Sequence, residues 1–401
     1  MLPDTEILNS IVSRVLHIED TTLGAPPKSF IIRYRGQLYG DSAAAYDQLA
    51  EALRSYEITP LFRLEDGRHV ILLMQGIVKP RPANLRVNLL WMALTVISVF
   101  MAGAWYVYDG PQPTGFSDFY RIAIVNILSG WPFAVSLLAI LFAHEFGHYL
   151  VGRYHGANVS LPYFLPLPFP GSFGTLGAFI QMKSIPKNRR HLLDIGIAGP
   201  LAGLIVAVPI LLYGLYISPV DRIPLVIPKD QGLTLEGNSI LYVTLKYIAK
   251  GELLPQPASY GDLHPALYWL RYIITGLPLP RGGTDVQLSA VAWAGWAGLL
   301  VTALNLIPAG QLDGGHLMYV LRGRRAVKLL PFILGALFLL GFIWTGWWLW
   351  AFLIFIFGRL YAEPLDLITP LDRPRQALAI LGVIIFLLVF TPVPMVLVSG
   401  G

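Results

Sequence analysis

The sequence contains no cysteine and little charge. None of its 401 residues is Cys, which excludes disulfide scaffolds, iron–sulfur clusters, thiolate zinc sites and cysteine nucleophiles. Any metal must therefore be held by nitrogen and oxygen ligands. Charged residues make up 13% of the chain, against roughly 25% in an ordinary soluble domain. Hydrophobic residues make up 55%, which also excludes disorder. The composition predicts an integral membrane protein, most of which lies in the lipid bilayer.

Residues 1–80 differ from the rest of the chain, because they carry charges throughout and contain no apolar run long enough to cross a membrane. The segment from Ser29 to Arg35 alternates in part like a strand, and Asp41 and Ser42 are placed to cap a helix. Asp66-Gly67 is a strong hairpin signal. We therefore expect a soluble α+β domain in residues 1–80 and a membrane-embedded domain in residues 81–401.

From Asn88 onward the chain has apolar stretches near the roughly 20 residues that a spanning helix requires. They predict a polytopic α-helical membrane protein with about seven transmembrane helices. The predicted spans are 88–108, 131–154, 192–217, 287–308, 326–343, 346–362 and 376–398. Residues 236–250 and 264–280 are apolar but carry charges or prolines, so we expect re-entrant or surface helices there.

Lys and Arg gather in short loops that should face the cytoplasm. These basic residues precede the first span or follow the second and fourth: Lys79, Arg81, Arg86, Arg153, Lys183, Lys187, Arg189, Arg190, Arg322, Arg324, Arg325 and Lys328. The pattern predicts a multi-pass protein of the cell membrane. Its N-terminus and the C-terminal ends of spans two and four, which carry the candidate site, should face the cytoplasm, and its C-terminus should lie outside. The net charge of +5 is then explained by the basic residues of the cytoplasmic loops. No basic patch is interleaved with aromatic residues, so no nucleic-acid partner is expected.

The second predicted span contains His144-Glu145-Phe-Gly-His148. Histidines four residues apart lie on one helical face and reach one metal ion, and the adjacent glutamate is placed to deprotonate a metal-bound water. Ionisable groups within a membrane helix are costly unless they pair with each other or with a metal. The motif therefore predicts a catalytic zinc site.

A catalytic zinc site usually has three protein ligands, and the end of the fourth predicted span offers the third. Asn305-x-x-Pro308 is followed there by Asp313-Gly314, which places a carboxylate just past a proline-broken helix. Spans two and four both run from outside to inside, so His144, His148 and Asp313 should meet at the cytoplasmic end. His316 is an alternative, either as a hydrogen-bonding partner of the site or in place of Asp313 as ligand.

These two motifs resemble those of the site-2 proteases, the intramembrane zinc metalloproteases. The resemblance covers residues 81–401, and Ala83-Asn84-Leu85-Arg86 is similar to the Gly-Asn-Leu-Arg element of the plastid and cyanobacterial branch, with Ala in place of Gly. It implies one catalytic Zn²⁺, a core of spans 131–154, 192–217 and 287–308, and cleavage of single-span or hairpin membrane proteins. No PDZ-like insertion is present.

Residues 161–182 are rich in proline and glycine and end in a strand-like piece. An edge strand here would hold an unwound substrate by strand addition, and the resemblance also points to a re-entrant β-hairpin; a simple connecting loop is the alternative. Asn305 is expected either to stabilise the oxyanion during hydrolysis or to hold the bend before Pro308 by an interhelical hydrogen bond. The remaining histidines are expected to be solvated or hydrogen-bonded.

Two other functions fit parts of this pattern. A membrane-anchored zinc protease that acts in water, of the prenyl-protein processing type, has a similar metal motif but a glutamate as third ligand. A zinc transporter or an inactive scaffold would use the same ligands without hydrolysis, yet it would have no need of Glu145.

Overall fold

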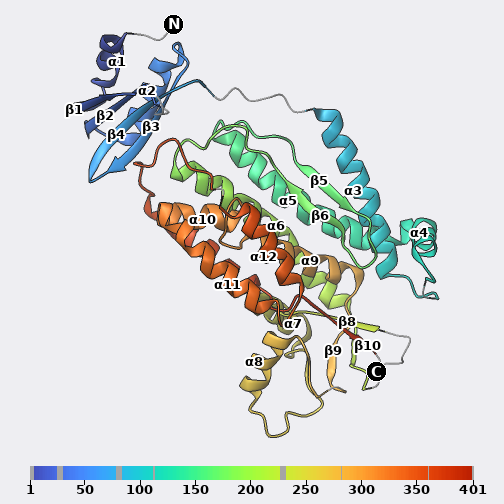
Figure 1. The fold of residues 1–401 in the computed structure, drawn as a ribbon. Helices are drawn as coiled ribbons and strands as arrows, with labels where there is room; N and C mark the ends of the chain where they lie inside the picture. The colour runs from blue at the N-terminus through green and yellow to red at the C-terminus, as the bar shows by residue number, and fades with distance from the viewer. Residues whose placement is uncertain are drawn as a thin grey trace.

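The computed structural model describes residues 4–24, 30–77, 84–111, 113–225, 232–280, 282–359 and 361–399. Four residues used in the sequence analysis, Ser29, Lys79, Arg81 and Ala83, lie outside these ranges. An N-terminal sheet stands at one end of a helical body, and small sheets with two short helices stand at the opposite end (Figure 1).

The N-terminal domain is a four-stranded antiparallel sheet with strand order β1-β2-β4-β3. Its elements are α1 (Thr5–Val12), β1 (Leu16–Leu23), β2 (Ile32–Leu38), α2 (Ser42–Arg54), β3 (Ile58–Glu65) and β4 (Arg68–Gln75). The predicted N-cap is confirmed, since Asp41 accepts a hydrogen bond from the Ala44 N–H at 3.1 Å. The predicted hairpin turn is also confirmed: Asp66 and Gly67 have φ of 51° and 77°, the left-handed conformation that a two-residue type I′ turn requires.

The helical body contains three helices long and apolar enough to cross a bilayer, among the residues that the structure describes. They are Leu85–Tyr106, Ile127–Tyr154 and Arg189–Ile217, and they match the first three predicted spans. The elements of this body are α3 (Leu85–Tyr106), α4 (Phe116–Val125), η1 (Ile127–Gly130), α5 (Trp131–Tyr154), α6 (Arg189–Ile217), α9 (Ala290–Asn305), α10 (Asp313–Arg322), η2 (Gly323–Leu329), α11 (Leu330–Leu340), α12 (Gly346–Phe357) and α13 (Arg373–Val389). Asn84 caps α3 by accepting the Arg86 N–H at 3.1 Å.

The last four predicted spans correspond to shorter helices. α9 has 16 residues, α11 has 11, α12 has 12 and α13 has 17. At 1.5 Å per residue α11 is about 16 Å long, which is half the hydrocarbon thickness of roughly 30 Å. The expectation of seven transmembrane helices therefore stays a prediction.

The seventh span was predicted to continue as a helix to residue 398, and this is wrong. α13 ends at Val389, and β10 (Met395–Ser399) pairs antiparallel with β8 (Gly232–Glu236). Pro392 and Pro394 lie between the helix and the strand. Proline has no N–H to donate and fixes its own φ, so the apolar run changes from helix to strand at this point.

A buried ion-pair network lies among the small sheets and short helices at the end of the molecule opposite the N-terminal domain. This end is built from β7 (Val220–Arg222), β8, α7 (Ile240–Lys250), α8 (Pro265–Thr275), β9 (Thr284–Val286) and β10. Lys246 is fully buried, and its Nζ lies 3.3 Å from Asp285 Oδ1 and 3.9 Å from Glu236 Oε1. α7 and α8 have 11 residues each, so neither is long enough to cross a bilayer alone.

An ion pair holds the start of α13 against α6. Arg375 Nη2 donates to Asp194 Oδ2 at 2.6 Å, and its Nε donates to Asp194 Oδ1 at 2.9 Å. His155, which follows α5, places its Nε2 3.0 Å from the same carboxylate. α5, α6 and α13 are thereby joined at one end of the helical body.

α3 crosses η1, which leads into α5, at a contact between two glycines. A Cβ added at Gly103 would lie 2.4 Å from the Gly130 carbonyl oxygen, whereas a Cβ at Gly335 in α11 would meet nothing within 4 Å. We expect Gly103→Ala to lower the free energy of unfolding by about 1–3 kcal/mol through overpacking. Gly335→Ala should raise it by about 0.5–1 kcal/mol, because alanine favours the helix.

Thermal unfolding of both variants in detergent measures this difference. A Gly103→Ala protein as stable as Gly335→Ala would contradict the close crossing of α3 and η1.

Candidate metal centre

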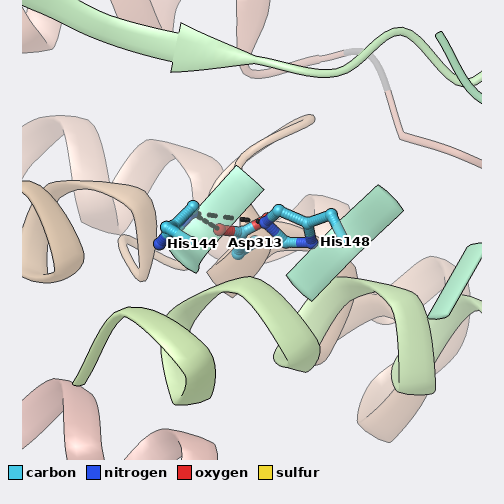
Figure 2. Close-up of side chains that lie close together, drawn as sticks. All are labelled: His144, His148 and Asp313. Carbon is cyan, nitrogen blue, oxygen red and sulfur yellow. Dashed lines mark hydrogen bonds and ion pairs between the residues drawn. The ribbon is translucent and has the colours of Figure 1, made fainter. Parts of the chain in front are cut away.

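The side chains of His144, His148 and Asp313 converge, as the motifs predict. Figure 2 shows the Asp313 carboxylate between the two imidazole rings, with one interaction to each. His144 and His148 lie one turn apart on α5, and Asp313 is the first residue of α10. Both histidines are buried, and Asp313 is nearly so.

The distances within this cluster fit a tetrahedral zinc ion. His144 Nε2 lies 3.3 Å from His148 Nε2 and 3.3 Å from Asp313 Oδ2, and His148 Nε2 lies 3.3 Å from Asp313 Oδ1. Ligand atoms at about 2.0–2.1 Å from a tetrahedral ion are separated by roughly 3.3 Å. The two histidine nitrogens therefore already have the spacing of zinc ligands, and the Asp313 carboxylate places one oxygen beside each of them.

A backbone hydrogen bond fixes the ring of His148. Its Nδ1 lies 2.7 Å from the Ile195 carbonyl oxygen, and a carbonyl oxygen only accepts, so Nδ1 donates. In the neutral ring Nε2 then carries the free lone pair and faces Asp313. Metal-binding histidines are commonly held in this way by a partner on the other ring nitrogen.

Glu145 is buried beside the cluster, with only 4% of its surface exposed. Its Oε2 has no hydrogen-bond partner among the described residues, which is costly for a buried carboxylate unless a ligand or water supplies one. Glu145 also lines a cavity of about 820 Å³ together with the three cluster residues. A metal-bound water in this cavity would give Glu145 its missing partner.

The sequence between α9 and α10 explains how Asp313 reaches α5. α9 ends at Asn305, and Gly310 turns the chain with a φ of 58°. A Cβ at Gly314 would lie 1.9 Å from the Leu306 carbonyl oxygen, and one at Gly315 would lie 2.2 Å from the Gly310 carbonyl oxygen. Only residues without a side chain allow α10 to begin so close to the end of α9.

The glycines of α6 that contact the histidines were missed by the sequence analysis. A Cβ at Gly199 would lie 2.0 Å from His148 Nε2, and one at Gly203 would lie 3.3 Å from His144 Nδ1. Gly196, which precedes them on α6, faces His316. Glycines spaced three and four residues apart in an apolar helix are typical of close helix–helix contacts, so this spacing was the available signal.

Asn305 and His316 both line the cavity but lie outside the three-residue cluster. Asn305 Nδ2 lies 3.3 Å from His144 Nε2, next to the expected metal position. His316 is buried, and its Nδ1 has no hydrogen-bond partner in the described part of the chain. The ligand geometry thus favours Asp313 over His316 as the third ligand.

Residues 161–182 contain the expected hairpin. β5 (Tyr163–Leu167) pairs antiparallel with β6 (Gly174–Phe179), with an irregularity between Leu165 and Pro166. Residues 178–186, which include the end of β6, line the cavity. Whether the hairpin enters the bilayer stays a prediction.

Three of the remaining histidines have the hydrogen-bonded roles expected for them. His69 Nδ1 accepts the Leu38 N–H at 3.0 Å, His264 Nδ1 accepts the Ala266 N–H at 3.2 Å at the start of α8, and His155 binds Asp194. They are therefore explained without a metal.

Comparison with known proteins decides the family. A model of peptidase family M50 matches residues 132–341, more than half of the chain and all of the metal cluster. The chain belongs to peptidase family M50. This confirms the resemblance to the site-2 proteases.

The chain is similar to plant proteins named as probable zinc metalloproteases of the chloroplast. It is 28% identical over 377 residues to EGY2 of Arabidopsis thaliana, covering 90% of this chain and 60% of the relative. It is 30% identical over 346 residues to EGY1 of Oryza sativa subsp. japonica, covering 81% of this chain and 53% of the relative.

The chain thus spans about 60% or less of the length of these relatives. No solved structure gives a significant match. The names of these M50 relatives include zinc, and the His-His-Asp cluster fits that ion. The same names place the relatives in the chloroplast, which does not match the cell membrane expected from the sequence.

We expect Asp313→Ala to lower zinc affinity by at least about 100-fold, because a direct ligand matters more than the supporting partners whose loss costs 10–100-fold. His316→Ala should keep one zinc per chain. Metal analysis after dialysis against a weak chelator measures both. Full zinc content in Asp313→Ala together with loss in His316→Ala would make His316 the ligand.

Gly199→Ala should also lose zinc, since the added methyl group would occupy the position of His148 Nε2. Gly203→Ala is the matched control on the same helix, because its added Cβ meets His144 at the milder distance of 3.3 Å. We expect the zinc content to fall in the order wild type, Gly203→Ala, Gly199→Ala. Equal zinc content in all three proteins would show that α5 and α6 do not pack this closely.

Proposed function

We propose that this M50 protein is a zinc endopeptidase that hydrolyses peptide bonds in or near the transmembrane segments of other membrane proteins. The observation that carries the proposal is the position of the metal cluster. His144, His148 and Glu145, whose Oε2 has no hydrogen-bond partner among the described residues, lie on a helix that is long and apolar enough to span a bilayer. A protease of the aqueous phase has no need to place its catalytic groups there.

The residues divide the chemistry between them. His144, His148 and Asp313 would hold the zinc ion, which would supply a water of lowered pKa and a Lewis acid for the scissile carbonyl. Glu145 accepts the proton of the attacking water and returns it to the leaving amine nitrogen. The Asn305 amide, beside His144, donates a hydrogen bond to the developing oxyanion.

The β5–β6 hairpin is suited to present the substrate. A spanning helix hides its carbonyl groups in hydrogen bonds, so it must be unwound before hydrolysis. β6 pairs with β5 on one side, and among the described strands no other pairs with it. An unwound segment added along the other edge of β6 would lead toward the cavity, whose wall begins at Ala178.

The arrangement of the chain supports a common side for the N-terminal domain and the zinc site. Lys187, in one of the basic loops, forms an ion pair with Asp47 of the N-terminal domain. α7, α8, β8, β9 and β10 lie at the opposite end of the molecule, together with the C-terminus that is expected outside (Figure 1). In our proposal the N-terminal domain, the basic loops and the zinc cavity share the cytoplasmic side of a multi-pass membrane protein.

Glu145→Gln tests the mechanism. The variant should fold and keep its zinc, because the amide has nearly the same shape and the three ligands remain. Its rate of cleavage of a reconstituted single-span membrane protein should fall by about 10²–10⁴-fold, the usual contribution of a general base. Undiminished cleavage with zinc present would reject Glu145 as the base.

A water-soluble peptide with the same cleavage sequence distinguishes the intramembrane proposal from an aqueous protease. The proposed enzyme cleaves the membrane-embedded form in preference. Faster cleavage of the soluble peptide would favour the aqueous alternative, and no cleavage of either form would favour a zinc-binding scaffold. Membrane proteomics of cells with wild-type chain or Glu145→Gln would then show which single-span proteins accumulate uncut.

A further inference from the structure

The connection between α12 and α13 (residues 361–371) continues the sheet of the N-terminal domain. β3 is an edge strand of that sheet. The Phe62 N–H donates to the Leu365 carbonyl oxygen at 2.9 Å, and the Leu367 N–H donates back to the Phe62 carbonyl oxygen at 3.1 Å. Phe62 and Asp366, which are 304 positions apart in the sequence, therefore pair as in a parallel sheet.

The other side of the α12–α13 connection pairs with the segment before α6. The Leu365 N–H donates to the Pro186 carbonyl oxygen at 3.0 Å, and the Asp366 N–H donates to the Lys187 carbonyl oxygen at 2.8 Å. Asp366 is completely buried, and its Oδ1 accepts the Ile368 N–H at 2.8 Å. The connection is thus hydrogen-bonded along both edges.

Arg63 is the side chain of the N-terminal domain that binds the connection most extensively among the polar contacts described. Its Nη1 donates to the Leu365 carbonyl oxygen at 2.7 Å and to the Pro364 carbonyl oxygen at 3.2 Å, and its Nε lies 3.8 Å from Glu363 Oε1. The Arg63 side chain is only 13% exposed. A buried guanidinium that satisfies carbonyl oxygens is a strong and geometrically specific contact.

Both segments held in this way form walls of the zinc cavity. Residues 178–186 line it from the hairpin side, and Tyr361, Ala362 and Glu363 line it from the connection. The N-terminal domain therefore binds the backbone immediately beside the cavity wall. It does not touch the zinc ligands themselves in any described contact.

We propose that Arg63 is a positioning residue, through which the docked N-terminal domain holds the wall of the zinc cavity in the shape that binds substrate. This inference rests on the proposed function and assigns a task to the N-terminal domain within it. Arg63 acts through the α12–α13 connection on the wall, so it affects substrate binding and leaves zinc binding and the chemistry at Glu145 unchanged.

The first test compares Arg63→Ala with Arg33→Ala in the full chain with zinc. Arg33 lies in the same sheet but binds Glu65, within the N-terminal domain. Arg63→Ala should raise KM for a single-span model peptide by about tenfold, the effect of losing one charged hydrogen-bond donor. kcat and zinc content should stay within about twofold of wild type, and Arg63→Lys should recover part of the loss. An unchanged KM, or an equal change in Arg33→Ala, would overturn the proposal.

Two readouts do not depend on turnover. Amide hydrogen exchange should become faster in residues 182–188 and 361–371 of Arg63→Ala, and it should not do so in Arg33→Ala. The affinity of the uncut peptide for the chain that carries Glu145→Gln should fall when Arg63→Ala is added. If wild type does not cleave the peptide at all, the proposed function fails, while the exchange measurement still decides whether Arg63 holds the wall.

A disulfide tests whether Arg63 acts by docking. The chain has no cysteine, and Ser42 Oγ lies 2.8 Å from Thr369 Oγ1 in a buried contact between the N-terminal domain and the connection. Oxidation of Ser42→Cys/Thr369→Cys in the Arg63→Ala background should restore KM, and reduction should remove the effect. Inhibition of the otherwise wild-type chain by the same disulfide would show that the domain must undock for activity, which would overturn the proposal.

Discussion

The close approach of α5 and α6 is the constraint on which the catalytic arrangement depends. Gly199 lies against the imidazole of His148, and the Ile195 carbonyl oxygen one turn earlier fixes the same ring. A side chain at either glycine that faces the histidines would occupy the space that the metal ligands need. α6 thus orients the two histidine ligands of α5, and Asp313, at the start of α10, supplies the third ligand.

Much of this centre could be predicted because its information is local. The four-residue spacing of His144 and His148 places both on one face of a helix. The basic loops give spans two and four the same direction, and this predicts that Asp313, just past Pro308, meets the two histidines. Gly199 was not predicted, since its role depends on which helix packs against α5. The docking of Arg63 onto residues 364 and 365 was equally hidden, because nothing in either segment indicates a partner 300 residues away.

The helix boundaries show where hydropathy stops being informative. An apolar run reports preference for a solvent, and it does not report backbone conformation. The first three spans coincide with long helices because nothing interrupts them except prolines that α6 accommodates at Pro200 and Pro209. Past Val389 the run stays apolar, yet Pro392 and Pro394 remove the donors that a helix needs, and β8 offers an edge for pairing. The prolines were the signal that the hydropathy average concealed.

α13 is fixed at both of its ends. Arg375 in its first turn binds Asp194 of α6, and beyond its last turn β10 pairs with β8. A helix held in this way cannot slide along its own axis or change its tilt much without breaking one of these contacts. Differences in bilayer thickness must then be met by deformation of the surrounding lipid. In the proposed function, these contacts then set the depth of the zinc centre in the membrane, and with it the level at which a substrate segment would be cut.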